Sequence, residues 1–168
     1  NIDQVPDPIT VRIGVKIPIL GHEVQLTKSS DRRIRQHDNQ LLVSEHKSNP
    51  AARALGYMKT LARDHLTQRS DFYAKKLGQD YHKLSVRDTR SRWGSCSQDR
   101  ALMFSWRLIM APQEVLDYVA AHEVAHLEHM NHSHRFWAVV EQLYGDYQPA
   151  RLWLRDKGPE LHRYHFVD

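Results

Sequence analysis

Residues 122–126 read His-Glu-Val-Ala-His, with a glutamate directly after the first of two histidines spaced four apart. On an α-helix, residues four apart lie about 40° apart around the axis and one turn along it, so two imidazoles can converge on one cation. Glu123 is turned by about 100° from His122, where its carboxylate can hydrogen-bond a zinc-bound water instead of the metal. The segment therefore predicts a Zn²⁺ site with His122 and His126 as ligands and Glu123 as the general base.

Chance explains this motif poorly, although the chain holds twelve histidines. We expect about 0.03 occurrences of the five-residue pattern in a chain of this composition. The apolar residues around the motif fit a half-buried helix; they are Val115, Leu116, Val119, Val124 and Leu127. The alternative is a pair of core or surface histidines that bind no metal.

A third ligand is needed, because a catalytic zinc ion takes three protein ligands and keeps a fourth position for water. If the helix continues to His129, that residue stands about 10 Å along the axis from His122, too far for both rings to reach one ion. His132 comes six residues after His126, and Asn131 can adopt a left-handed turn between them. His132 is therefore the favoured third ligand. The alternatives are a neighbouring histidine or a distant acid: His129, His134, Glu141 and Glu160.

The first half of the chain predicts a sheet followed by a long helix. Short apolar runs at residues 9–19, 23–26 and 40–43 are separated by turn residues, which favours a small antiparallel sheet. Pro50 then opens a segment with apolar residues at helical spacing, and Gly78 closes it. The order of these patterns predicts an α+β fold.

The second half predicts strands and then helices. Residues 83–107 favour strands on either side of an irregular loop around Gly94. A helix from Pro112 to about His129 carries the histidine pair, a further helix follows Ser133, and a last one covers residues 150–157.

Composition and charge narrow the class of protein. The chain has 168 residues, 40% of them hydrophobic and 26% charged, which is typical of one folded globular domain. The net charge of +4 is spread along the chain, so nucleic-acid binding is permitted but weakly supported. No apolar stretch is long enough to span a membrane. The single cysteine, Cys96, and the lack of a signal-peptide core predict a cytoplasmic protein.

Cys96 itself has two interpretations. The simpler one is an inert thiol, and the other is a thiolate that caps the zinc ion in a latent state.

Three segments carry a family resemblance: HEVAHLEHMNHSHRFW at 122–137, RSRWGSCS at 90–97 and FSWRLIMAP at 104–112. Together they resemble the YgjP-like bacterial metallopeptidases, relatives of the WLM and SprT-like zinc proteases. The resemblance covers most of the chain and is strongest over residues 90–154. It departs at His134, where relatives have a proline, and the glycine of the metzincin motif is replaced by His129.

The resemblance implies an α+β, minimal zincin-like metallopeptidase fold with an N-terminal antiparallel sheet, a long helix and an active-site helix. It also implies that His132 is the third ligand. On this basis residues 1–168 form a single metallopeptidase-like domain. Its parts are a β-rich segment at 1–48, a long helix at 49–80 and a zinc-binding catalytic part at 81–168.

The predicted function is hydrolysis of peptide bonds in a peptide or protein substrate. Arg90, Arg92 and Tyr118 are candidate donors to the oxyanion, and spacing does not choose among them. The strand at 102–106 is either an edge that binds an extended peptide or an internal strand.

Two alternative functions would involve a different substrate or partner. A metal-dependent nucleotide hydrolase is supported only by the density of arginines, which are Arg87, Arg90, Arg92 and Arg100. A DNA-associated protease or binding module is suggested by the basic pI and by the SprT-like relatives.

Overall fold

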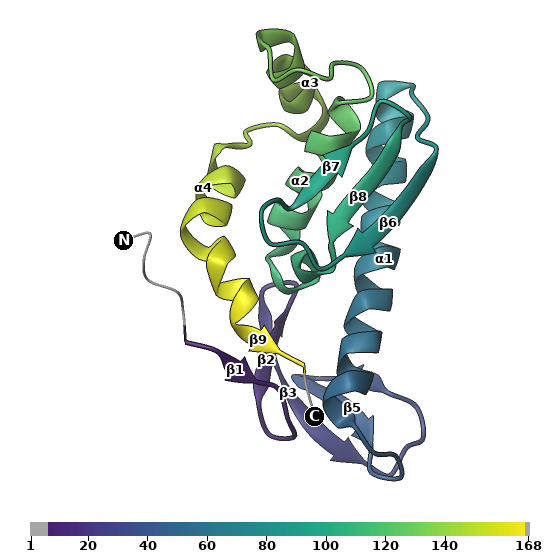
Figure 1. Cartoon of the computed structure of the whole chain (residues 1–168), viewed down its shortest axis with the longest axis vertical. Helices are drawn as coiled ribbons and strands as arrows, with labels where there is room; N and C mark the ends of the chain where they lie inside the picture. The colour runs from purple at the N-terminus through teal and green to yellow at the C-terminus, as the bar shows by residue number, and fades with distance from the viewer. Residues whose placement is uncertain (1–6, 167–168) are drawn as a thin grey trace.

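Of the three small β-sheets within residues 7–166, two lie toward opposite ends of a long helix (Figure 1). Three shorter helices lie beside the one of these two sheets that comes later in the chain. This computed structural model describes residues 7–166. The elements follow in the order β1 (Ile9–Thr10), β2 (Lys16–Ile19), β3 (His22–Ser29), β4 (Arg35–His37), β5 (Gln40–Ser44), α1 (Pro50–Leu77), β6 (Lys83–Arg87), β7 (Gly94–Cys96), β8 (Ala101–Ser105), the 3-10 helix η1 (Trp106–Met110), α2 (Gln113–Ala125), α3 (His134–Tyr144), α4 (Gln148–Lys157), the 3-10 helix η2 (Gly158–Arg163) and β9 (Tyr164–His165). The expected mixture of small sheets and helices is confirmed.

The N-terminal sheet is mixed, so the antiparallel prediction for it is wrong. Its strand order is β2-β3-β5-β4, and β3 and β5 run parallel. After β3 the chain leaves room for one strand and forms β4. It then turns at Asp38 and Asn39, and the next strand, β5, lies between β4 and β3. An inserted strand of this kind must run parallel to β3, because β4 has already reversed the direction.

The turn between β2 and β3 joins this sheet to the rest of the molecule. Leu20 and Gly21 both have positive φ, 50° and 80°, as a two-residue hairpin turn requires. The amide of Leu20 donates to the carbonyl of Ile109 at 2.6 Å. A Cβ on Gly21 would lie 3.1 Å from Cα of Pro112. The turn therefore fixes the start of α2 relative to the sheet.

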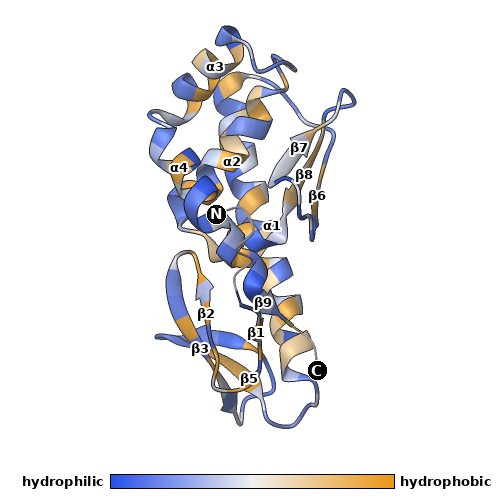
Figure 2. Cartoon of the chain, turned by 60° about the vertical axis from the view of Figure 1, so that its left-hand side comes forward, coloured by the Kyte–Doolittle hydropathy of each residue, from blue (hydrophilic) through white to orange (hydrophobic). Residues whose placement is uncertain are grey.

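The long helix α1 has the predicted bounds, beginning at Pro50 and ending before Gly78, whose φ is 76°. One stripe of α1, at four-residue spacing, is fully buried: Ala54, Met58, Ala62, Leu66 and Ser70. The small residues in this stripe let α1 approach α2, η1 and both sheets. Hydrophobic and hydrophilic residues alternate along α1 (Figure 2). No helix in the described part of the chain has the length and hydropathy of a membrane span.

The second sheet has the order β6-β8-β7, which corrects one prediction and decides between two alternatives in another. The region around Gly94 is a strand, β7, and not only a loop. The expected strand at 102–106 is β8, Ala101–Ser105, and it lies in the centre of the sheet, so it is the internal strand and not an edge. Trp106 already belongs to η1, because the side chain of Ser105 accepts a hydrogen bond from Arg107 N and begins a helical turn there.

The helix α2 ends earlier than predicted, at Ala125 and not near His129. The amides of His126 and Leu127 bond to the carbonyls three residues back, so the chain tightens and leaves the helix. The next helix, α3, follows Ser133 as predicted, with the Ser133 hydroxyl accepting from Phe136 N at 3.3 Å.

Arg107 is a buried cation that ties the C-terminal segment to the end of β6. Its side chain donates to Asp88 at 2.8 Å and to the carbonyls of Leu161 and Tyr164 at 2.8 and 3.0 Å. Burial raises the pKa of Asp88, but the hydrogen bond and charge of Arg107 outweigh burial, so the pKa of Asp88 is lowered. These contacts hold η2 and β9 in place.

We predict that Arg107→Ala lowers the free energy of unfolding by about 2–4 kcal/mol, because Asp88 loses its cation and two carbonyls lose their donor. Denaturant titration followed by circular dichroism measures the loss. The lowered pKa means that Asp88 stabilises the fold above its unfolded pKa and that this contribution disappears as the pH falls, so the difference should shrink in acid. Arg35→Ala, which breaks an exposed pair with Asp31, is the control and should change little. Similar losses for both variants would contradict the prediction.

Candidate metal centre

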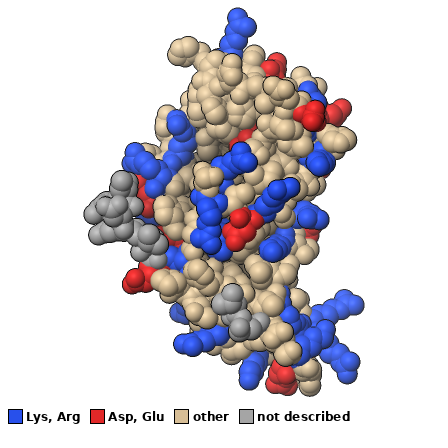
Figure 3. Space-filling model, viewed as in Figure 1, with Lys and Arg blue, Asp and Glu red and all other residues tan. Residues whose placement is uncertain are grey.

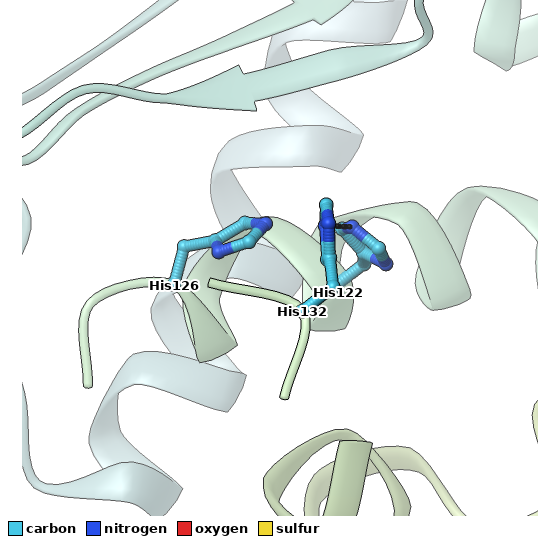
Figure 4. Close-up of side chains that lie close together, drawn as sticks. All are labelled: His122, His126 and His132. Carbon is cyan, nitrogen blue, oxygen red and sulfur yellow. Dashed lines mark hydrogen bonds between the residues drawn. The ribbon is translucent and has the colours of Figure 1, made fainter. Parts of the chain in front are cut away.

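Three histidines converge at the C-terminal end of α2. His122 comes from the last turn of α2, His126 caps that helix, and His132 comes from the segment that leads to α3. Their rings face one another in Figure 4. One ligand nitrogen of each lies within 4.8 Å of the others, and they form the group of possible metal ligands found among residues 7–166. The structure therefore brings together the three predicted ligands, and His129, His134, Glu141 and Glu160 lie outside the group.

The spacing of the nitrogens fits one tetrahedral cation. Nε2 of His122 and Nε2 of His132 lie 3.3 Å apart. Two zinc–nitrogen bonds of about 2.0–2.1 Å at a tetrahedral angle place their nitrogens about 3.3–3.4 Å apart. The pair has the separation that two ligands of the same ion need.

The other ring nitrogens of two histidines are held by hydrogen bonds. Nδ1 of His126 lies 3.0 Å from the carbonyl of His129, and because a carbonyl only accepts, this nitrogen carries the proton and Nε2 keeps its lone pair. Nδ1 of His122 lies 3.0 Å from the hydroxyl of Tyr118. Such contacts orient a ligating imidazole. Tyr118, which the sequence suggested as an oxyanion donor, contacts a ligand instead.

Aromatic side chains from α3 form one side of the site. The ring of Phe136 stacks on His126 at 4.3 Å between centroids and lies 4.9 Å from the rings of both His122 and His132. Trp137 lies 5.5 Å from His122. These contacts were not predicted from the sequence, since helical periodicity does not show what a helix packs against.

Burial keeps His122 and His126 neutral. It lowers the pKa of His122 to about 3, with the charges of His126 and His132 as further causes. Burial also lowers the pKa of His126. Neutral imidazole is the form that binds metal.

Glu123 lies against β7. It is only 6% exposed. Burial raises its pKa to about 8, although the charge of Arg92 acts in the opposite direction. A Cβ on Gly94 would lie 3.0 Å from Cγ and 3.1 Å from Oε2 of Glu123. The missing side chain at Gly94 therefore makes the space in which the carboxylate lies.

A pocket of about 230 Å³ joins these groups. Its lining combines β7 with the histidine segment: Gly94, Ser95, Cys96, His122, Glu123, His126, Met130 and His132. Burial, followed by the charge of Glu123, raises the pKa of Cys96 to about 11. Cys96 lies outside the group of three possible metal ligands, which agrees with the inert interpretation of this cysteine.

The arginines of the nucleotide hypothesis are spread over several places. Arg87 lines a separate pocket with Lys59 and Arg63 between α1 and β6. In the space-filling view, Lys and Arg are spread over the visible face of the molecule (Figure 3). Arg100 donates to Gln79 and to the carbonyl of Asp80. Arg87 therefore lies apart from the histidines, whereas Arg100 lines a pocket of about 300 Å³ that His126 also borders.

Comparison with known proteins agrees with the geometry of the site. A family model described as YgjP-like, metallopeptidase domain, matches residues 3–157. Among solved structures, the metallopeptidase zymogen of Pyrococcus abyssi abylysin is similar at 20% sequence identity and a TM-score of 0.46, over 61% of this chain and 97% of that chain. No curated protein matches the chain. Because the family model spans most of its length, the chain belongs to the YgjP-like metallopeptidase family, a family of metal-dependent hydrolases.

Proposed function

We propose that the chain is a zinc-dependent peptidase in which His122, His126 and His132 hold the metal and Glu123 is the general base. The observation that carries this proposal is the convergence of three imidazole nitrogens, two of them 3.3 Å apart, on a pocket that a buried carboxylate also lines. Three imidazoles favour zinc over the oxygen-seeking ions Ca²⁺ and Mg²⁺. They also leave a fourth position for a substrate or water.

The metal and the carboxylate have separate tasks. When bound, zinc supplies a Lewis acid that polarises a carbonyl and lowers the pKa of a coordinated water to about 7. Glu123 takes the proton of the attacking water and passes it to the leaving amine. Its burial supports this role. Because the pocket is poorly hydrated, a cation held by the histidines would act strongly on the carboxylate and would favour its ionised form.

The edge of β7 is the proposed binding surface for an extended peptide. Among residues 7–166, β7 pairs only with β8, and its residues Gly94, Ser95 and Cys96 line the pocket beside the histidines. A peptide that adds to this edge by backbone hydrogen bonds would pass in front of the metal site. This replaces the internal strand β8 as the candidate.

The domain arrangement follows from this proposal. We assign residues 1–168 to one metallopeptidase domain of the minimal zincin type. Its active-site helix is α2, which packs against α1.

Glu123→Gln tests the general base. The variant keeps the shape of the side chain and loses its basicity, so turnover of a peptide substrate should fall about 10²–10⁴-fold while zinc content stays unchanged. Peptide hydrolysis and metal analysis on the same preparation measure both. Glu128→Gln, an exposed glutamate nearby, is the matched control. Full activity in zinc-loaded Glu123→Gln would reject the role.

His132→Ala tests the third ligand. Because His132 is exposed, the variant should fold normally, and its zinc affinity should fall more than about 100-fold, beyond the usual cost of losing a group that only supports a ligand. Competition with a chelator measures the affinity. His134→Ala removes an exposed histidine two residues away and should bind zinc normally. Equal zinc affinity in the two variants would argue against His132 as a ligand.

Gly94→Ala tests the space that Glu123 occupies. The new Cβ would meet Glu123 Cγ at 3.0 Å and the carbonyl of Met103 at 3.1 Å, so the carboxylate must shift. We expect kcat to fall about 10–100-fold with zinc affinity unchanged. Gly56→Ala is the control, because a Cβ on Gly56 meets nothing within 4 Å, and it should leave activity intact. Normal kcat in Gly94→Ala would show that the carboxylate tolerates displacement.

A further inference from the structure

A guanidinium group is held beside the histidine cluster by an aromatic ring. Arg151 in α4 places its guanidinium carbon 4.5 Å from the ring centroid of Trp137. The same Trp137 ring lies 5.5 Å from the ring of His122 and 6.0 Å from that of His132. One tryptophan therefore links a cation in α4 to two of the three histidines.

The Arg151 cation has no acidic partner among residues 7–166: no carboxylate there lies within 4.0 Å of it. The next arginine of α4, Arg155, is paired with Asp156 at 3.0 Å. Through Trp137, this unpaired charge lies near the rings of His122 and His132.

The stack restrains the guanidinium. Trp137 stacks on Tyr147 at 4.9 Å with an interplanar angle of 28°, and Tyr147 stacks in turn near Tyr118, the residue that contacts His122. A planar guanidinium packs well on such a ring and keeps its N–H groups free to donate. A cation held in this way, exposed to solvent and without a counterion, is suited to a carboxylate, which it can bind through two parallel hydrogen bonds.

We propose that Arg151 binds a carboxylate of the substrate, either its C-terminal carboxylate or an acidic side chain, and so selects peptides that carry a negative charge near the cleaved bond. This inference rests on the proposed peptidase function. Metal and guanidinium would both attract such a substrate, since a divalent cation on three neutral histidines leaves the site positive.

The experiment compares matched peptides on the wild-type protein and on Arg151→Gln. The probes are quenched fluorescent peptides that share one neutral sequence. The first pair differs only in having a free or an amidated C-terminus. The second pair differs only in having Glu or Gln at one internal position, and each internal position is tested in turn. The first pair tests the terminal carboxylate and the second tests the side chain. For the preferred pair, the ratio of kcat/KM between the charged and the neutral peptide should fall about 10–100-fold in Arg151→Gln, as the loss of a charge-assisted hydrogen bond predicts.

Two further variants separate charge from geometry. Arg151→Lys keeps the charge but loses the planar fork, so its ratio should lie between those of wild type and Arg151→Gln. Arg155→Gln removes a charge one turn further along α4 and should keep the wild-type ratio. Circular dichroism checks that each variant is folded, which the exposure of Arg151 favours.

Binding of the same peptides to metal-free protein gives a readout that does not depend on turnover. Wild type should bind the charged member of the pair more tightly, and Arg151→Gln should lose this preference. If wild type hydrolyses no peptide but shows the preference, the proposed function fails, and only the binding of a carboxylate by Arg151 is supported. An unchanged preference in Arg151→Gln, an equal loss in Arg155→Gln, or no preference in wild type overturns the inference.

Discussion

The end of α2 is the constraint on which the site depends. If the helix ran on, His132 would stand about 15 Å along the axis from His122. The chain instead leaves the helix at Ala125 and turns back. As a result, Nε2 of His122 and Nε2 of His132 lie 3.3 Å apart. The bond between Nδ1 of His126 and the carbonyl of His129 closes this turn and fixes the tautomer of His126 at once. Local backbone and ligand geometry are therefore set by the same contact.

The strand β7 completes the site from the other side, and it does so with backbone. Gly94 lies against Glu123 with no side chain between them, so the carboxylate packs directly against the backbone of β7. Both walls are held by long-range packing: α2 rests on α1, and the turn at Gly21 bonds to the segment before α2. The N-terminal sheet thus contributes to the site through α2 and not through direct contact.

Local signals in the sequence were sufficient for some features and not for others. The helix α1 begins at Pro50 and ends before Gly78, as predicted, because cap residues act within one turn. The pairing of β3 with β5 and the strand β7 escaped prediction because strand partners are set by contacts far apart in the chain. The end of α2 was missed for a different reason. No glycine or proline marks it, and the bond from His126 to the carbonyl of His129 is a feature of the folded site.

The same dry environment has opposite effects on the two kinds of group in the pocket. Removing water disfavours charge, so it keeps His122 and His126 neutral, with lone pairs that need no deprotonation to accept a metal. For Glu123 it favours the protonated acid. A cation on the histidines reverses this preference, because its positive charge stabilises the nearby carboxylate. In the proposed zinc site, metal binding and the ionisation of Glu123 would therefore be coupled, because an ion held by the histidines would also favour the ionised form of the proposed base.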